Sequence, residues 1–282
     1  MTGLTFITTP FMLAACHPTR GARFSNTHVH MAPPPPRACT KTRAASSAKT
    51  LLYTHTLCPY AHRVELAFRE KQIVHQLKHV DLSNKDAQFL ADNPRGLVPA
   101  VMLEDGTCLV ESVDIVKWLA TEFSESGTNL TVPESIADAD ARVERAAYRA
   151  VSVIGGDKGA WSVGTFRRGG ADAAVQAAAP ALDDIRDLLA YEPGPYIGGE
   201  SPCVYDLILY PFWTRAALAL HEIHGAKSWK SKWSSVAAWL DAMDERPSAM
   251  ATATNSQRLV AAWRRTGRFD FFDYETASRE SL

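Results

Sequence analysis

Several features that would place the chain in a specialised class of protein are missing from its 282 residues. No stretch of 18 apolar residues occurs, so we expect no membrane-spanning helix. No internal repeat is evident, and the cysteines form neither a Cys-x-x-Cys pair nor the Cys/His spacing of a zinc site. The five cysteines are an odd number at scattered positions. This pattern does not indicate a disulfide framework, and it favours a reducing compartment and no metal.

Acidic residues are absent from the first 50 positions, which carry six Lys or Arg, and the first acidic side chain is Glu65. Residues 51–282 hold 24 basic against 31 acidic residues, a net charge of −7. This charge, without a basic stripe, argues against nucleic-acid binding and fits a protein that acts on small molecules. The acid-free residues 1–48 are typical of an organelle-targeting leader. An unstructured tail without an address is the alternative.

The rest of the sequence divides into an α/β half and a helical half. Strands are predicted at 51–53, 76–82, 98–103 and 107–110, with helices from Pro59, at 86–93 and at 112–123. This order is the thioredoxin-like plan. Beyond the linker at 125–133, helices are predicted near 134–154, 171–191, 203–222, 231–245 and 247–265. We therefore expect a thioredoxin-like domain at 49–124, an all-α bundle at 134–268 and a C-terminal tail at 269–282.

Cys58 and Pro59 open the first predicted helix. Pro59 suits the first helical position, which makes Cys58 the N-cap, where unpaired N–H groups and the helix dipole favour a thiolate. His62 and Arg63 add nearby positive charge, so we expect a lowered pKa for the thiol. Ala61 replaces the second cysteine of a dithiol motif, so a soluble thiol has to resolve any mixed disulfide. A buried, inert cysteine is the alternative.

Two further segments carry features of a binding site. Val98-Pro99 opens a strand, a good place for a cis peptide that exposes the backbone of Val98 to an extended peptide. An ordinary edge-strand proline is the alternative. Glu111 and Ser112 precede a predicted helix that Ser112 caps. The Ser112 hydroxyl and the first amides can hold a carboxylate, and Glu111 can hold an ammonium group. Simple helix capping is the alternative.

The order and spacing of these segments resemble the omega class of glutathione transferases. The matching segments are Tyr53-x4-Cys58-Pro59-Tyr60-Ala61-x-Arg63-Val64, Asp81-Leu82-Ser83-Asn84-Lys85, Asn93-Pro94-x-Gly96-Leu97-Val98-Pro99 and Glu111-Ser112. Residues 114–119 and the acid-free leader look more like the plant lambda class. The resemblance covers about residues 51–265. Cys203 departs from the family pattern, because it stands where the family has a Ser or Thr three residues before Asp206.

The resemblance implies a role for each matching residue. Glutathione would be a co-substrate, with Cys58 as the nucleophile and no metal. The residues implied to bind glutathione are Tyr60, Lys85 (at the glycine carboxylate), Val98 and Pro99 (at the cysteinyl backbone), and Glu111 and Ser112 (at the γ-glutamyl group). Trp213 and Arg215 stand on a helix that faces the acceptor pocket in the omega class.

The implied activity is glutathione-dependent thiol transfer or dehydroascorbate reduction, with a mixed disulfide between Cys58 and glutathione. The expected partners are glutathione and a small oxidised or disulfide acceptor, with no nucleic acid and no membrane span, in a monomer or homodimer. The leader then favours a chloroplast over a mitochondrion, with a cytoplasmic protein as the alternative. Two functions remain open beside this one: conjugation of glutathione to electrophiles, with Tyr53 as the activating hydroxyl, and a non-catalytic ligand-binding module of the same fold.

Overall fold

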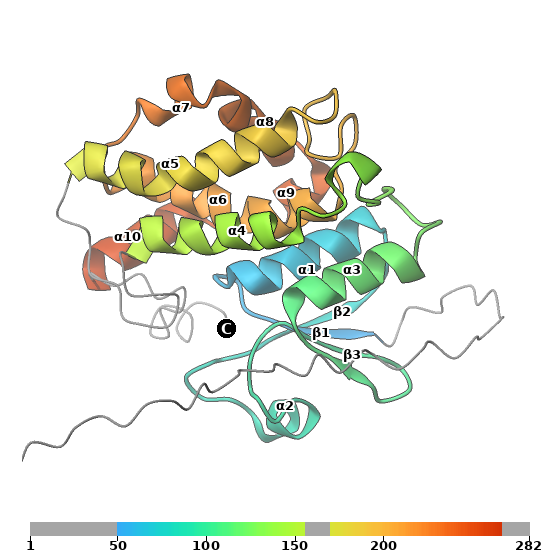
Figure 1. The fold of residues 1–282 in the computed structure, drawn as a ribbon. Helices are drawn as coiled ribbons and strands as arrows, with labels where there is room; N and C mark the ends of the chain where they lie inside the picture. Colours follow the sequence, from blue (N-terminus) through green and yellow to red (C-terminus); the bar gives the residue numbers. More distant parts are fainter. Residues whose placement is uncertain (1–49, 156–169, 267–282) are drawn as a thin grey trace, which may run out of the picture. The chain divides into compact units, whose positions relative to one another are not determined.

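The computed structural model describes residues 50–155 and 170–266 (Figure 1). Its sheet has the strand order β2-β1-β3-β4, formed by β1 (Leu51–Thr54), β2 (Gln76–His79), β3 (Ala100–Met102) and β4 (Cys108–Leu109). Strand β1 runs parallel to β2, with Leu52 opposite Leu77, and antiparallel to β3, with Leu52 opposite Val101. Strands β3 and β4 form the predicted antiparallel hairpin.

Helices cover both faces of this sheet. α1 (Pro59–Glu70) and α3 (Ser112–Glu122) lie on one face, and α2 (Ala87–Asp92) lies on the other (Figure 1). The alternation along β1 explains the two layers, because successive side chains point to opposite faces. Leu52 joins the core that contains Phe68 of α1, whereas Tyr53 packs with Phe89 of α2. The thioredoxin-like α/β fold predicted for this half is confirmed.

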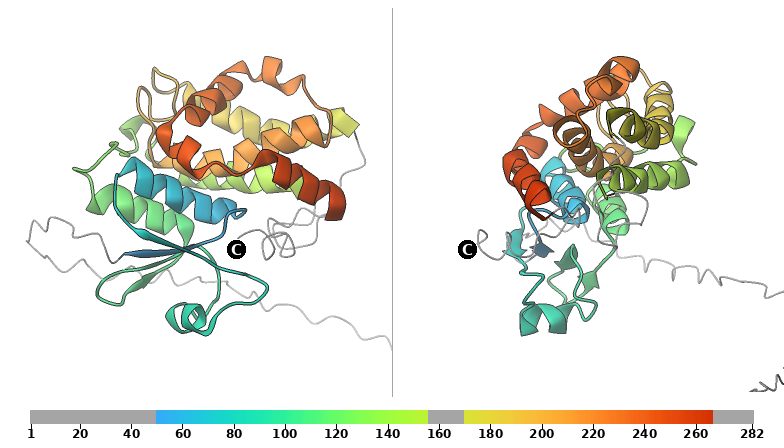
Figure 2. Two further views of the ribbon diagram at one scale, coloured as in Figure 1. Left: turned by 180° about the vertical axis from the view of Figure 1, so that it is seen from behind. Right: turned by 90° about the vertical axis from the view of Figure 1, so that its left-hand side faces the viewer.

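The second half is helical, as predicted. A 3-10 turn (Glu134–Ile136) precedes α4 (Asp140–Gly155), and the helices that follow are α5 (Gly170–Leu189), α6 (Val204–Glu222), α7 (Trp229–Lys232), α8 (Ser234–Asp244), α9 (Pro247–Thr252) and α10 (Ser256–Thr266). α6 is buried along most of its length and packs against α4, α1 and α3. The helical half therefore lies on the side of α1 and α3 that faces away from the sheet (Figures 1 and 2). Within the described ranges, no helix is long and apolar enough to cross a membrane.

Two predicted helices differ from the structure. The helix expected at 247–265 is two helices, because Ala253 adopts an extended backbone (φ −57°, ψ 128°). Asn255 Oδ1 then accepts a hydrogen bond from Arg258 N (3.0 Å), which starts α10. The helix expected from 134 begins at Asp140, after the 3-10 turn. The predicted leader at 1–48, the C-terminal tail at 269–282 and most of the Gly-rich stretch at 155–170 lie outside the described residues.

Two buried charges tie the end of α1 to the linker and to the start of α9. Glu70 is 5% exposed and accepts hydrogen bonds from Arg246 (2.6 Å from both Nε and Nη2), Ser248 and Thr128. Lys71 is fully buried, and its Nζ donates to the carbonyl of Thr128 (2.9 Å). A hydrogen-bonded buried ion pair of this kind is costly to break, because the remaining partner would be an uncompensated charge. These contacts fix the C-terminal end of α1 against the linker and the start of α9.

Candidate active site

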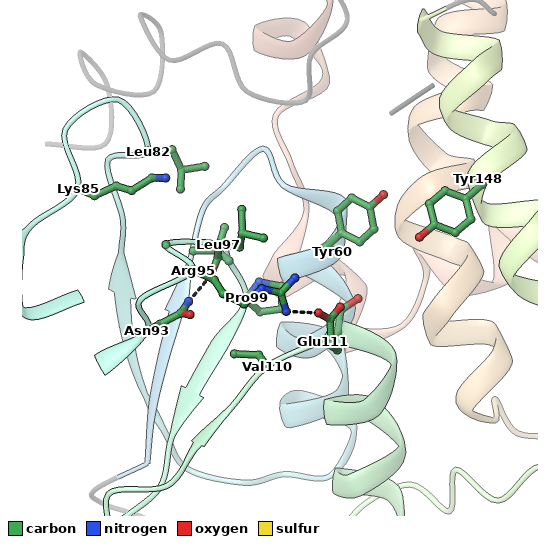
Figure 3. A pocket seen from close by; sticks show the side chains of 13 residues that line it. Tyr60, Leu82, Lys85, Asn93, Arg95, Leu97, Pro99, Val110, Glu111 and Tyr148 are labelled. Atoms are coloured by element: carbon green, nitrogen blue, oxygen red, sulfur yellow. Dashed lines mark hydrogen bonds and ion pairs between the residues drawn. The ribbon is translucent and has the colours of Figure 1, made fainter. Parts of the chain in front are cut away.

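A pocket of about 160 Å³ opens between the N-terminal ends of α1 and α3 and the loops before β3 and after β2 (Figure 3). The six residues predicted to bind glutathione all line it: Tyr60, Lys85, Val98, Pro99, Glu111 and Ser112. They come from four separate segments of the sequence, which the thioredoxin-like fold brings together. The other residues that line the pocket are Leu82, Asn93, Arg95, Gly96, Leu97, Val110 and Tyr148.

One wall of the pocket is the loop that leads into β3. The Val98–Pro99 peptide is cis, as predicted. Asn93 Nδ2 donates to the carbonyl of Leu97 (2.7 Å) and holds the preceding turn. Gly96 has a positive φ of 61°, and a β-carbon there would approach Leu90 to 3.1 Å. This conformation favours glycine and brings the backbone of residues 96–98 close to the pocket.

Charged side chains stand at the mouth of the pocket. Arg95 forms an ion pair with Glu111, and the two side chains are 57% and 58% exposed. Lys85 makes no ion pair within the part of the chain that the structure describes, so its charge is available to an anion. Arg95 is a lining residue that the sequence analysis did not single out. The available signal was its place inside the segment Asn93-Pro94-x-Gly96, at the position that the family pattern leaves unspecified.

The start of α3 differs in detail from the expectation. Ser112 is the first helical residue, and the cap position belongs to Glu111, whose φ is 67°. The Ser112 hydroxyl accepts a hydrogen bond from Arg63 Nη1 (3.1 Å) instead of capping the helix. The prediction that the Ser112 side chain caps α3 is therefore wrong, because the buried guanidinium of Arg63 occupies this acceptor. The first amides of α3 still lie beside the pocket.

Cys58 is the N-cap of α1, as predicted. Its Sγ accepts a hydrogen bond from Ala61 N (3.5 Å) and donates to the carbonyl of Val98 (3.8 Å). The thiol is 0% exposed and does not line the pocket itself. It lies directly behind Val98, in a small core with Tyr53, Phe89 and other apolar residues of the sheet.

The burial of Cys58 changes its acidity. Burial raises the pKa of the thiol to about 11, although the amides of Ala61 and Tyr60 and the charges of Arg215 and Arg63 all lower it. The prediction of a lowered pKa is therefore wrong. The N-cap and the basic neighbours are present as expected, but desolvation of the thiolate outweighs them.

The two predicted acceptor-pocket residues occupy different places. Trp213 is fully buried, its Nε1 donates to the carbonyl of Ala146 (3.1 Å), and it does not line the pocket. Arg215 lines a second cavity of about 450 Å³ between α6, α8 and the α9–α10 turn, which it shares with His62. Facing Tyr60 across the first pocket is Tyr148 of α4 (Figure 3), which the sequence analysis missed because helical periodicity does not say which face of a helix meets a pocket.

Tyr53, the alternative catalytic hydroxyl, is engaged elsewhere. Its side chain is 1% exposed, and its hydroxyl donates to the carboxylate of Asp92. Burial and this hydrogen bond raise the pKa of Tyr53 far above its ordinary value. Tyr53 is also absent from the lining of the pocket. No group of His, Cys, Asp and Glu side chains within residues 50–155 and 170–266 is arranged to hold a metal ion.

A thioredoxin-like domain with a cysteine at the start of α1, packed on an all-helical partner, defines the class of two-domain glutathione-binding enzymes. Residues 57–122 match the N-terminal domain family of glutathione S-transferases, and residues 140–242 match the C-terminal domain family. The chain belongs to the glutathione S-transferase family.

Relatives fall among the cysteine-type members. The chain is 28% identical over 213 residues to the "Probable glutathione S-transferase DHAR1, cytosolic" of Oryza sativa subsp. japonica, covering 73% of this chain and 88% of that one. It is 26% identical to "Glutathione S-transferase DHAR3, chloroplastic" of Arabidopsis thaliana, covering 73% of each. The solved dehydroascorbate reductase of Chlamydomonas reinhardtii has the same fold, with a TM-score of 0.60, 22% identity, and coverage of 78% of this chain and 99% of that one. Omega-class glutathione transferases are also similar.

Proposed function

We propose that this protein is a glutathione-dependent thiol transferase and dehydroascorbate reductase in which Cys58 forms a mixed disulfide with glutathione. The observation that carries this proposal is the placement of Cys58, at the N-cap of α1 with its sulfur against the carbonyl of Val98. Val98 lines the pocket whose other residues match those expected to bind glutathione. The names of the rice, Arabidopsis and Chlamydomonas proteins support the choice of activity.

Glutathione fits the charges of the pocket. Lys85 faces the pocket and would meet the glycine carboxylate. The amides at the start of α3 suit the γ-glutamyl carboxylate, because a helix N-terminus favours an anion. Glu111 would take the γ-glutamyl ammonium group. The exposed backbone of Val98 would pair with the cysteinyl residue, which places the glutathione sulfur beside Cys58.

The reaction proceeds by two thiol–disulfide exchanges. The Cys58 thiol first releases its proton to solvent, and the thiolate attacks the glutathione sulfur of a mixed disulfide. A bond forms between the two sulfurs, the acceptor's sulfur leaves as a thiolate, and Cys58 becomes glutathionylated. A second glutathione thiolate then attacks the bound glutathione sulfur, which releases glutathione disulfide and returns the electron pair to Cys58. With dehydroascorbate, two glutathione molecules supply two electrons and two protons and leave as glutathione disulfide.

Neither of the other described cysteines replaces the missing second thiol. Cys203 is buried at the start of α6, and Cys108 lies on β4. The second thiol in this scheme therefore comes from free glutathione. Conjugation through Tyr53 is disfavoured, because the Tyr53 hydroxyl already donates to Asp92 and lies outside the pocket.

Turnover with a small glutathionylated disulfide tests the proposal. Cys58→Ser should lower turnover by at least about a hundredfold, because it removes the nucleophile. Cys108→Ser is the matched control and should retain the parent rate. Tyr53→Phe should also stay within about twofold, since no catalytic step uses this hydroxyl. Full turnover by Cys58→Ser would overturn the proposal, and a loss confined to Tyr53→Phe would favour conjugation. Binding of glutathione without turnover in the parent would favour the ligand-binding module.

We also propose that residues 1–48 direct the protein to an organelle, a chloroplast rather than a mitochondrion. The support is the absence of acidic residues from this segment and the chloroplastic relative from Arabidopsis. The rice relative is named cytosolic, which is the alternative. Comparing the cellular location of the full chain with that of a chain from residue 49 distinguishes the two, because removal of a targeting segment abolishes import.

A further inference from the structure

Two buried guanidinium groups lie near Cys58 without a carboxylate partner. Arg63 and Arg215 are 4% and 1% exposed, and neither forms an ion pair within the described residues. Arg63 donates to the carbonyl of Ile208 (2.9 Å) and to the Ser112 hydroxyl (3.1 Å), and it lies over the ring of Phe212. Burying a charge without a compensating one is costly. Retaining two such charges together indicates that an anion forms close by.

Arg215 is held in place by a chain of hydrogen bonds. Its Nη1 donates to the carbonyl of Pro211 (2.6 Å) and contacts His62 Nδ1 (3.1 Å), and its Nη2 donates to Thr254 Oγ1 (2.7 Å). A guanidinium can only donate, so His62 Nδ1 is the acceptor and the ring proton sits on Nε2. His62 Nε2 then donates to Thr252 Oγ1 (2.9 Å).

The hydrogen bonds of Thr252 agree with this tautomer of His62. The Thr252 hydroxyl uses its own proton to donate to the carbonyl of Ser248 (2.8 Å), which leaves its oxygen free to accept from His62. His62 is 5% exposed, and burial together with the adjacent charge of Arg215 lowers its pKa well below the ordinary value. A neutral His62 is therefore a fixed acceptor for Arg215 at neutral pH.

Arg215 lies beside the first turn of α1. Its partner His62 donates a backbone hydrogen bond to the carbonyl of Cys58 (3.0 Å). Its partner Thr254 donates to the carbonyl of Thr56, two residues before Cys58 (3.3 Å).

Of the charged side chains that lower the pKa of Cys58, Arg215 has the largest effect and Arg63 the next. Burial lowers the pKa of Arg215 to about 10, so the guanidinium stays charged at neutral pH. Of the groups that raise the pKa of Arg215, Cys58 has the largest effect. The other titratable groups that face this cluster are Tyr60, His62 and Glu65 of α1, Glu144 and Tyr148 of α4, and Tyr210 of α6.

We propose that Arg215 supplies the countercharge for the Cys58 thiolate and that His62 is the residue that positions Arg215. The proposal rests on the assignment of Cys58 as the nucleophile. Arg215 then acts in both exchanges: it stabilises the thiolate that attacks, and it stabilises the same sulfur when the second glutathione displaces it and the electron pair returns to Cys58. A better-stabilised leaving sulfur leaves faster.

The test is the rate at which iodoacetamide, a small neutral reagent, alkylates Cys58 in the full-length protein without glutathione. The modified Cys58 peptide is quantified by mass spectrometry between pH 7 and 9. Below the pKa of the thiol, a rise of that pKa by one lowers the thiolate fraction tenfold. Arg215→Met should lower the rate about tenfold at each pH, and Arg215→Lys, which keeps the charge, should lower it less.

His62 is tested with Arg215 intact. His62→Leu removes the acceptor and should lower the rate about threefold, whereas His62→Gln should restore most of it, because an amide both accepts and donates. If circular dichroism shows that Arg215→Met does not fold, the comparison of His62→Leu with His62→Gln tests the proposal instead. If Arg215 and His62 only stabilised the packing, these variants would raise the alkylation rate, because loosened packing uncovers the buried Cys58 thiol.

The matched control removes the guanidinium that pairs with Glu70 at the other end of α1. The double variant Arg246→Met with Glu70→Gln should be less stable but should not lower the alkylation rate. The proposal is overturned if Arg215→Met alkylates as fast as the parent or faster, or if His62→Gln is no better than His62→Leu. Because no glutathione is present, either result leaves the turnover test with Cys58→Ser to be judged separately.

Discussion

At the scale of single residues, the ion pair between Arg95 and Glu111 sets the polarity of the pocket mouth. Both side chains are more than half exposed, so the pair is weak and exchanges readily with a ligand. The γ-glutamyl end of glutathione carries an ammonium and a carboxylate on one carbon. It can therefore take over Glu111 with its ammonium group while Arg95 turns to its carboxylate.

This exchange predicts opposite effects for two variants. Glu111→Gln should reduce the preference for glutathione over its des-amino analogue by up to about tenfold, equivalent to about 1.4 kcal/mol. Arg95→Gln should increase that preference, because it leaves Glu111 without its competing cation. Competition binding of the two ligands to each variant measures both ratios. An unchanged ratio for Glu111→Gln would show that Glu111 does not contact the ammonium group.

The residues of the pocket were predictable to different degrees. The segments around Val98 and Glu111 could be found because their spacing to Cys58 follows a family pattern that the fold conserves. The acidity of Cys58 could not, because sequence position reveals the helix start but not the depth of burial. The environment of Arg215 was missed for the same reason: its partners His62 and Thr254 are 153 and 39 residues away along the chain.

At the scale of elements, the start of α6 is organised around one buried carboxylate. Asp206 is 0% exposed and accepts hydrogen bonds from Ile197 N (2.9 Å), Gly198 N (3.2 Å), Cys203 N (2.8 Å) and Trp239 Nε1 (2.8 Å). The bond from Cys203 N closes the reciprocal half of a capping box. The other donors come from the preceding loop and from α8, so Asp206 connects three segments.

Removing this carboxylate should destabilise the protein strongly. Asp206→Ala leaves four donors without an acceptor. Three of these hydrogen bonds are buried, at about 1–3 kcal/mol each, so we expect a loss of at least about 3 kcal/mol in the free energy of unfolding. Asp206→Asn keeps one oxygen and should lose less. Urea denaturation of the two variants provides the measurement. A loss under about 1 kcal/mol for Asp206→Ala would mean that water replaces the carboxylate.

The break between α9 and α10 could not be predicted from the sequence. Residues 247–265 have helical composition throughout, and only the local cap at Asn255 and the extended backbone of Ala253 separate the two helices. The turn matters for the site, because it carries Thr254, whose hydroxyl accepts from Arg215. Its Oγ1 also donates to the carbonyl of Thr56, in the loop before Cys58.

At the scale of the whole molecule, buried neutral histidines couple stability to pH. His55 is 3% exposed, and burial lowers its pKa to about 4; burial also lowers the pKa of His62. In the unfolded chain both take up protons below about pH 6.5. The folded state binds fewer protons in this range, so the stabilising contribution is complete above pH 6.5 and is lost as the pH falls.

We therefore expect the free energy of unfolding to fall by about 1.4 kcal/mol per pH unit for each of these histidines between pH 6 and 5. Asp206 has the opposite effect on the pH dependence of stability, because burial raises its pKa and the folded state then binds its proton more readily than the unfolded state. Urea denaturation at pH 7, 6 and 5 gives the slope, and His62→Gln should reduce it by about 1.4 kcal/mol per pH unit. A stability independent of pH over this range would contradict the expected neutrality of both rings.

The charges at the end of α1 have a consequence for recombination between related genes. Glu70 and Lys71 belong to the α/β half. The Glu70 carboxylate is paired with Arg246, the N-cap residue of α9, and the Lys71 ammonium donates to the carbonyl of Thr128 in the linker. A hybrid that joined this first half to a foreign second half would inherit a buried carboxylate and a buried ammonium with no assured partners. Exchange of halves between relatives is therefore compatible with folding only where both contacts are inherited together.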